Sequence, residues 1–293
     1  MKNPLVSIPV VTYNSAETII ETLDSIYNQT YPNIELIVSD DCSTDNTVEI
    51  VREWMEKHKD RFVRTKIITI PENKGVSANY NRAADACQGV WVKDFDGDDI
   101  LLPEAIQTYI DYVTEHPETI YVFGKCKAFG IDEERCKDID TMFDYSFYEM
   151  SKDQQLHRLL VEGNCVPSST SFYNRERITQ LGIRNDERIP MLEDWPKWIN
   201  LIKAGVKFHF TDKVLVKYRV SENSLSTGRA RSEKFNMSSA LFYIYYCFPY
   251  ECEHGSKRQA VENWLRAQNT IHKSKFWYLL FKSYKLLVMH KLH

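Results

Sequence analysis

The first hundred residues alternate between strand-type and helix-type patterns, and this alternation restricts the fold more than any other feature. Short apolar runs of strand type cover 5–11, 34–38, 63–70 and 90–95. Amphipathic segments of helix type are expected between them, at 14–27, 44–58 and 75–87. Strands and helices that alternate at this spacing predict an α/β fold with a mainly parallel sheet, right-handed crossovers and flanking helices.

Two local signals refine this prediction. Pro9 has no N–H to give to a neighbouring strand, so we expect its strand to lie at an edge or to carry a bulge. Asn14 and Glu17 have the spacing of a capping box, which predicts that the first helix begins at Asn14.

An acidic turn follows the fourth apolar run. Asp96 and Asp98 alternate around Gly97, with Asp99 next in line. Open α/β sheets bind ligands at the carboxyl ends of their strands, and this turn is expected there. Two such carboxylates can hold Mg²⁺ or Mn²⁺, which would cancel their mutual repulsion and suggests a diphosphate ligand. The alternative is an acidic turn that only caps the next helix.

The other predicted strands also end in polar side chains. Since parallel strands end at the same edge, these residues should gather on one rim of the sheet and form a binding site. They are Thr12, Tyr13 and Asn14, then Ser39, Asp40 and Asp41, then Glu72 and Asn73. For Ser43, Thr44 and Asp45, which follow the second strand, a role as helix caps explains the pattern as well.

Composition describes an ordinary globular protein of one large or two smaller domains, with 293 residues, 43% hydrophobic and 27% charged. No apolar stretch of about 18 residues predicts a transmembrane helix. Residues 1–4 lead straight into a strand without the pattern of a signal peptide. The seven cysteines form no CxxC pair and are odd in number, so we expect reduced thiols in a cytoplasmic protein and no zinc site.

The C-terminal segment differs from the rest in charge. Residues 256–293 hold eight Lys or Arg and one acid, about +7, which leaves about −11 for the remaining chain. The aromatic run 276–281 lies among these lysines. One hypothesis is an interfacial helix that docks on anionic lipid at the inner face of the membrane. The alternative is a packed helix with a solvated basic face. Nucleic-acid binding is not expected, because the body is acidic and contains no recognition motif.

Six short motifs follow one another along the chain in a characteristic order. They are VSIPVVTYN (6–14), DDCSTD (40–45), NKG (73–75), DGDD (96–99), MLEDWPKW (191–198) and YRVSENS (218–224). Together they resemble the motifs of the family 2 glycosyltransferases, over residues 5 to 226. The resemblance implies a GT-A fold, a Rossmann-like mainly parallel sheet flanked by helices. It divides the chain into a catalytic domain (1–230) and a helical, basic, aromatic-rich extension (231–293). Within the domain, 1–103 would form the nucleotide-binding half and 104–230 the acceptor-binding half.

The resemblance also implies roles for single residues. Asp40 would accept the pyrimidine N3–H of the donor and Tyr13 would stack on the base. Asp98 would bind the metal, Mn²⁺ or Mg²⁺, and Asp194 would be the general base. The remaining residues of the nucleotide-sugar site would be Thr12, Asn14, Glu17, Asn73, Asp96 and Arg219.

Several of these roles have alternatives. Glu193 and Asp194 could be a charge pair at a helix N-terminus. Arg219 could compensate diphosphate charge from a loop or form a surface salt bridge. The loop 221–231 could close over bound donor. The chain also departs from the family pattern, with Cys42 in place of the usual Gly and Tyr80 in place of a common Arg.

The function that follows is an inverting, metal-dependent transfer of a hexosyl or N-acetylhexosaminyl group. The donor would be a nucleoside-diphosphate sugar, with a UDP-sugar expected. The acceptor would be a saccharide or a lipid-linked saccharide in polysaccharide or oligosaccharide biosynthesis. A nucleotidyltransferase would need a glycine-rich basic loop after the first strand, which residues 13–16 do not provide. A non-catalytic partner subunit is the other alternative, although it would not need Asp96, Asp98 and Asp194.

Overall fold

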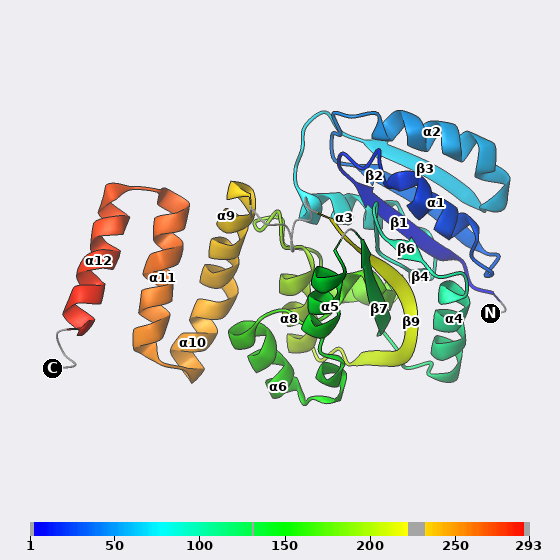
Figure 1. Cartoon of the computed structure of the whole chain (residues 1–293). Coiled ribbons are helices and arrows are strands. Elements are labelled where there is room, and N and C mark those ends of the chain that lie inside the picture. The colour runs from blue at the N-terminus through cyan, green and yellow to red at the C-terminus, as the bar shows by residue number, and fades with distance from the viewer. Residues whose placement is uncertain (1–2, 131, 222–231, 290–293) are drawn as a thin grey trace.

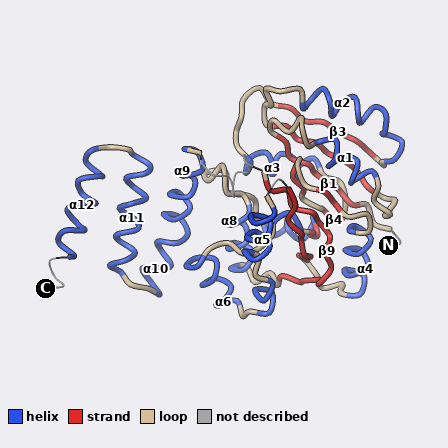
Figure 2. The backbone as a smooth tube through the Cα atoms, viewed as in Figure 1, coloured by secondary structure: helices blue, strands red, loops and turns tan. Residues whose placement is uncertain are grey.

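A computed structural model describes residues 3–130, 132–221 and 232–289, and within them nine strands form one sheet with helices around it (Figures 1 and 2). The strands are β1 (Val6–Thr12), β2 (Ile34–Asp40), β3 (Arg64–Thr69), β4 (Trp91–Val92), β5 (Phe95–Asp96), β6 (Ile100–Leu101), β7 (Tyr121–Gly130), β8 (Phe172–Asn174) and β9 (Phe208–Val220). The first helices are α1 (Ile19–Tyr27), α2 (Thr47–His58), α3 (Val76–Ala86), α4 (Ala105–Glu115), α5 (Glu133–Met142) and α6 (Lys152–His157). They are followed by α7 (Arg175–Leu181), α8 (Asp194–Lys203), α9 (Glu233–Phe242), α10 (Phe248–His254), α11 (Lys257–His272) and α12 (Lys275–Met289).

The sheet has a parallel half and a mixed half. Its order is β3-β2-β1-β4-β8-β7-β9-β6, and β5 continues the pairing of β4 along β1. Strands β1 to β5 pair in parallel, as the alternation of strands and helices predicts. In the second half, β8 is antiparallel to both its neighbours while β7 and β9 are parallel. The predicted fourth strand, 90–95, is divided into β4 and β5.

The register aligns the carboxyl ends of the parallel strands. Thr12 pairs with Asp40, and Asp40 pairs with Thr69 on its other side. Val11 pairs with Asp96 across the β1–β5 contact. The polar residues that follow these strands therefore start from one edge of the sheet, which we call the carboxyl rim.

The expectation that Pro9 marks an edge strand or a bulge is wrong, because β1 is central and keeps an unbroken register with β2. On its other side, the carbonyls of Ser7 and Val11 accept from Lys93 and Gly97. Since backbone groups alternate along a strand, Pro9 faces the break between β4 and β5, where no N–H is needed.

The C-terminal helices extend in a row from the part of the chain that holds the sheet, with α12 outermost (Figure 1). The nearer ones share its core: Phe235, Phe242 and Tyr246 belong to the same buried cluster as Trp198 and Phe208. The outermost helix instead exposes large apolar side chains, including Phe276 at 65% and Leu279 at 56%.

Two further findings bear on the sequence predictions. None of the described helices is both long enough and apolar enough to cross a bilayer. All seven cysteines, each within the described ranges, are free thiols.

Candidate active site

The acidic turn links β5 to β6 at the carboxyl rim. Asp96 ends β5, and Asp98 and Asp99 follow in the turn. Gly97 is required because a Cβ there would lie 2.8 Å from the Thr12 Cγ2 and 3.1 Å from the Val11 carbonyl oxygen. Close packing against the end of β1, rather than room for a ligand, thus explains this glycine.

The carboxylate of Asp96 is held by a residue of α3. The Tyr80 hydroxyl donates to Asp96 Oδ1 at 2.7 Å. Burial raises the pKa of Asp96, while this hydrogen bond and the Lys93 ammonium oppose the rise. The tyrosine that departs from the family pattern therefore lies within the site and contacts one of its carboxylates.

Arg219 lies in β9 and binds the back of the turn, so the expectation that it acts from a loop is wrong. Its Nε donates to the Asp98 carbonyl at 2.7 Å, and its backbone N–H donates to Asp99 Oδ1 at 2.8 Å. Its guanidinium also pairs with Glu21 and lies 4.5 Å from the centre of the Phe129 ring. Asp99 is a buried residue of the turn.

Negative charge accumulates in this turn. Burial and the charge of Asp96 raise the pKa of Asp98 to about 7, although Arg219 opposes the shift. Burial and its two acidic neighbours likewise raise the pKa of Asp99 well above its usual value. The cost of holding these carboxylates together would fall if a cation bound beside them.

The turn suits a hard divalent cation in chemistry but does not enclose one. Carboxylate oxygens are the ligands that Mg²⁺ and Mn²⁺ prefer. Within the described residues, however, no three His, Cys, Asp or Glu side chains are grouped to hold a metal. An ion at Asp98 would need further oxygens from a bound ligand, as is usual for Mg²⁺ in phosphate-binding sites.

Behind the turn lies a buried network of two lysines. The Lys93 ammonium donates to the carbonyls of Asp94 and Ser169 at 2.6 and 2.5 Å. The Lys197 ammonium lies 3.3 Å from Asp94 Oδ2. Burial lowers the pKa of Lys93 to about 8 against the attraction of nearby aspartates. These two lysines place positive charge on the protein side of the acidic turn.

Asp40 ends β2 and is fully buried. Its Oδ2 accepts from the hydroxyls of Thr12 and Ser43 at 2.9 and 2.5 Å, and its Oδ1 accepts from the Ser43 N–H at 2.8 Å. Thr12, also predicted in the site, thus contacts Asp40 directly. A carboxylate with three fixed donors has a defined orientation, and lone pairs remain for another donor.

The predicted capping box does not form. Helix α1 begins at Ile19, while Asn14 adopts a positive φ of 52°. Its side chain accepts from the Thr44 N–H at 2.8 Å, and its own N–H donates to the Ser43 hydroxyl at 2.8 Å. Asn14 therefore binds the loop after β2 instead of capping a helix. Glu17 is exposed just before α1, and the neighbouring Tyr13 ring is 50% exposed.

Asp41 organises the third segment of the rim. Its carboxylate accepts from the N–H groups of Lys74 and Gly75 at 3.0 and 2.7 Å, and the Asn73 amide donates to its carbonyl at 3.0 Å. The next residue, Cys42, has a φ of 68°, a left-handed conformation that favours glycine. The Cys that stands in place of the family's usual Gly is therefore in a strained backbone conformation.

Glu193 immediately precedes α8, and Asp194 is its first residue. Asp194 accepts from the Asn164 amide at 2.8 Å and from the Trp195 N–H at 2.6 Å. Burial raises the pKa of Asp194, and the charge of Asp96 adds to the rise. Burial, Asp194 and Asp96 raise the pKa of Glu193 in the same direction.

These charges act between residues that lie far apart in the sequence. Asp96 acts on both Glu193 and Asp194, and Glu193 acts on Tyr80. We call the group formed by Asp96, Asp98, Glu193 and Asp194 the acidic centre. Such a group could serve a phosphate-bound cation and a proton acceptor at once. Asp96 and Asp98 are paired carboxylates in the turn, and Asp194 is a carboxylate at the start of a helix.

Sequence reasoning missed several of the supporting residues. Tyr80 was recognised only as a departure, and Asp41 only as a polar strand end. Glu21, the partner of Arg219, gave no local signal, because 198 residues separate the two. The loop predicted to close over the donor, 221–231, lies outside the described residues except for Ser221.

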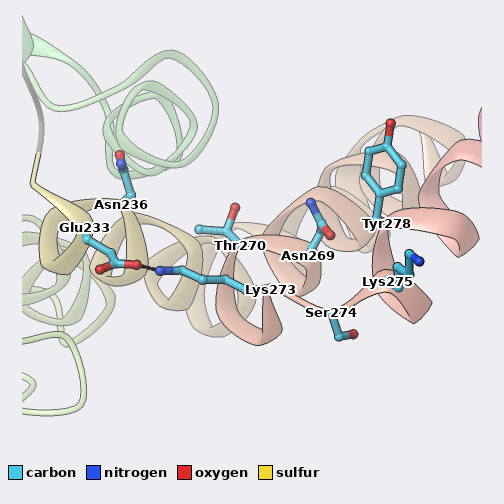
Figure 3. Close-up of a pocket in the computed structure, with 8 residues that line it drawn as sticks. All are labelled: Glu233, Asn236, Asn269, Thr270, Lys273, Ser274, Lys275 and Tyr278. Carbon is cyan, nitrogen blue, oxygen red and sulfur yellow. Dashed lines mark ion pairs between the residues drawn. The ribbon is translucent and has the colours of Figure 1, made fainter.

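A separate pocket lies in the extension (Figure 3). It has a volume of about 720 Å³ and lies between α9 and the α11–α12 pair. The side chains that line it are polar except for one ring, and Glu233 and Lys273 form an ion pair across it. They are Glu233, Asn236, Asn269, Thr270, Lys273, Ser274, Lys275 and Tyr278. None of the predicted site residues lines this pocket.

Comparisons with known proteins agree with the geometry. A sequence profile described as glycosyl transferase family 2 matches residues 7–180. The chain is 28% identical over 239 residues to the UDP-Glc:alpha-D-GlcNAc-diphosphoundecaprenol beta-1,3-glucosyltransferase WfaP of Escherichia coli. That match covers 81% of this chain and 85% of WfaP.

Two solved structures share the fold. TarS 1-349 of S. aureus, in complex with UDP-GlcNAc, has a TM-score of 0.60 at 20% identity and covers 91% of this chain and 72% of its own. In a longer crystal structure of TarS, the chain spans 48% of that protein. The mannosyltransferase PcManGT from Pyrobaculum calidifontis, in complex with GDP-Man and Mn²⁺, has a TM-score of 0.62 at 19% identity. The match covers 100% of this chain and 77% of the PcManGT chain. These two structures confirm the predicted GT-A fold.

Proposed function

The chain belongs to glycosyl transferase family 2, and we propose from this that it moves a sugar from a nucleoside-diphosphate donor to a saccharide acceptor with inversion. The observation that carries the proposal is the acidic centre: the charge of Asp96, which lies two residues before Asp98, contributes to the raised pKa of both Glu193 and Asp194. A metal-binding carboxylate and a general base on opposite sides of one space are what a single displacement at an anomeric carbon needs.

We propose that the donor is a UDP-sugar. Asp40 offers only acceptor atoms, which suits a pyrimidine N3–H, and the exposed ring of Tyr13 can stack on the base. WfaP is named for UDP-Glc and TarS was solved with UDP-GlcNAc, so a UDP-linked hexosyl or N-acetylhexosaminyl donor is favoured over a GDP-linked donor such as the GDP-Man of PcManGT.

The rest of the donor would contact the carboxyl rim. Asn14, Glu17 and Asn73 would lie beside the base and the ribose. Asp96, positioned by Tyr80, would hold the ribose or the sugar. Thr12 acts through Asp40, and Arg219 holds the turn that carries Asp98. A Mn²⁺ or Mg²⁺ bound by Asp98 would stabilise the charge of the departing diphosphate.

The chemistry of transfer then belongs to Asp194. Its carboxylate takes the proton of the acceptor hydroxyl while that oxygen forms a bond to the anomeric carbon. The bond from this carbon to the diphosphate oxygen breaks, and the electron pair leaves with the nucleoside diphosphate. The attack comes from the side opposite the leaving group, so the anomeric configuration inverts.

The acceptor is proposed to be a growing polysaccharide or a lipid-linked saccharide, as in the reaction for which WfaP is named. A membrane-borne acceptor would explain α12, where exposed Phe276, Leu279 and Leu280 lie near Lys275 and Lys282. We propose that this helix docks on anionic lipid, so that the enzyme associates peripherally with the inner face of the membrane.

Hydrolysis of a panel of nucleotide sugars with Mn²⁺ tests the function. We expect turnover with a UDP-sugar, loss of Mn²⁺-dependent donor binding in Asp98→Asn, and a 10²- to 10⁴-fold lower kcat with intact donor binding in Asp194→Asn. Asp186→Asn is the matched control, because Asp186 is paired with Arg188 and hydrogen-bonded by Tyr246. Full turnover in Asp194→Asn would move the base to Glu193.

A further inference from the structure

Asp194 is held by a side chain from a distant loop. The Asn164 amide nitrogen donates to Asp194 Oδ2 at 2.8 Å, while the Trp195 N–H donates to Oδ1 at 2.6 Å. The two donors reach different oxygens, so together they fix the plane of the carboxylate. Trp195 is part of the same helix as Asp194, which leaves Asn164 as the external constraint.

The orientation of Asn164 is itself determined. Its side-chain oxygen accepts from the Val166 N–H at 3.1 Å, which directs the NH₂ group towards Asp194. The preceding helical segment is tied to α8, because the Trp195 indole donates to the Leu159 carbonyl at 2.8 Å. The Cys165 carbonyl accepts from the Asp144 N–H at 3.3 Å. Asn164 is therefore presented by a loop that is fixed on both sides.

An amide suits this position better than a charged partner would. The charged groups near Asp194 are mainly acidic: Glu193, the residue before α8, and Asp96 on β5 both interact with it, while Lys197, one turn along α8, interacts with Glu193. Burial and Asp96 raise the pKa of Asp194, and the Asn164 hydrogen bond opposes that rise. A neutral donor can favour the ionised carboxylate without forming an ion pair that would neutralise it as a base.

We propose that Asn164 is the positioning residue of the base, holding the Asp194 carboxylate in the orientation that receives the proton of the acceptor hydroxyl. This inference rests on the proposed function, because it assumes that Asp194 is the base. In this role Asn164 does not contact the donor. Its loss should therefore affect proton transfer and leave donor binding unchanged.

The test compares Asn164→Ala and Asn164→Asp with the wild-type chain. We expect kcat to fall at least tenfold in Asn164→Ala and further in Asn164→Asp, which adds a like charge. The dissociation constant of UDP with Mn²⁺ should stay unchanged. Since the lost hydrogen bond favoured the charged carboxylate, the acidic limb of the kcat–pH profile should move to higher pH.

Asn200→Ala is the matched control, because it also removes an asparagine hydrogen bond from α8, to Tyr246 at 3.2 Å, and should change neither kcat nor the profile. If Asn164→Ala does not fold, Asn164→Ser, whose hydroxyl can still accept from Val166, replaces it. An unmoved profile with wild-type kcat, or a fall in kcat that only follows weaker UDP binding, would overturn the inference. If Asp194→Asn keeps its turnover in the same assay, the proposed base itself is wrong.

Discussion

Adjacent aspartates in this chain have different environments, and the environment of each carboxylate indicates its use. Asp40 is fixed by two hydroxyls and an N–H, whereas Asp41 accepts from backbone N–H groups and shapes the next loop. Asp99 accepts from the backbone of β9, whereas Asp98 keeps a pKa of about 7 beside Asp96. Residue type alone does not distinguish these tasks, because hydrogen-bond partners set them.

Removing the Tyr80 hydroxyl should weaken donor binding. A hydrogen bond to a charged group contributes about 1.5–3 kcal/mol, so Tyr80→Phe should raise the donor dissociation constant by about tenfold or more. Isothermal titration calorimetry with UDP-sugar and Mn²⁺ measures this dissociation constant. Tyr31→Phe is the control, since it loses a hydroxyl bond to the Pro4 carbonyl at the opposite end of β1. Equal affinities of Tyr80→Phe and wild type would show that Asp96 needs no such support.

Cys42→Gly should make the protein more stable. A side chain at a φ of 68° costs about 1 kcal/mol, and glycine removes that cost. We expect the free energy of unfolding in urea to rise by up to about 1 kcal/mol. Cys42→Ala keeps a Cβ in the same strained conformation and should bring no gain. A less stable Cys42→Gly variant would mean that the thiol makes a compensating contact.

At the level of elements, the two ends of the parallel strands have different properties. The carboxyl ends carry the acidic centre, while the amino ends are joined through Glu35 of β2. Glu35 is buried and pairs in register with Ser7 of β1 and Arg64 of β3, both of which donate to it. It also accepts from Gln88 and Gly89, which precede β4. One side chain thus links three strands and the connection to a fourth.

Glu35→Gln should therefore destabilise the fold without touching catalysis. The amide would place a donor against Arg64 and lose the charge that its four partners need, so we expect about 2–3 kcal/mol less stability in urea. Turnover per folded molecule should be unchanged, since the site lies at the other end of the strands. Glu49→Gln, on the exposed face of α2, should have no effect. A Glu35→Gln variant as stable as the wild type would contradict this role.

The elements were largely predictable because their apolar periods are regular, whereas the connections were not. The three N-terminal helices and β1 to β3 lie within a few residues of their predicted spans. The prediction of an edge strand or a bulge at Pro9 was wrong because the missing N–H faces a break in the partner strands, which the local sequence does not reveal. Asn14 misled because its side chain binds Thr44, thirty residues away, in preference to the nearby helix start. The partnership of Asn164 with Asp194 depends on tertiary contacts alone.

At the level of the whole molecule, the extension presents a basic and apolar helix, α12, at its outer end (Figure 1). Phe276 and Leu279 are exposed by 65% and 56%, next to lysines of the same helix. No packing inside the described chain explains this exposure. The membrane proposal does, because such side chains enter the lipid interface while the lysines meet its negative charge.

Vesicle binding should depend on these side chains. We expect the full chain to sediment with phosphatidylglycerol vesicles, and Phe276→Ser with Leu279→Ser to lower the partition coefficient at least tenfold, since each buried CH₂ contributes about 0.8 kcal/mol. Val63→Ser removes an equally exposed apolar residue from the catalytic part and should bind normally. Undiminished sedimentation of the double variant would refute α12 as the docking element.

The ring of Phe242 on α9 lies 4.3 Å from that of Trp195, the residue after Asp194. This contact matters for chimeras between relatives, because it joins the extension to the helix that carries Asp194. A foreign tail grafted after residue 231 would meet Trp195 with an unmatched surface and shift the start of α8. A chimera that takes both Trp195 and Phe242 positions from the same relative should remain active. A chimera that takes only the extension from a relative should lose activity.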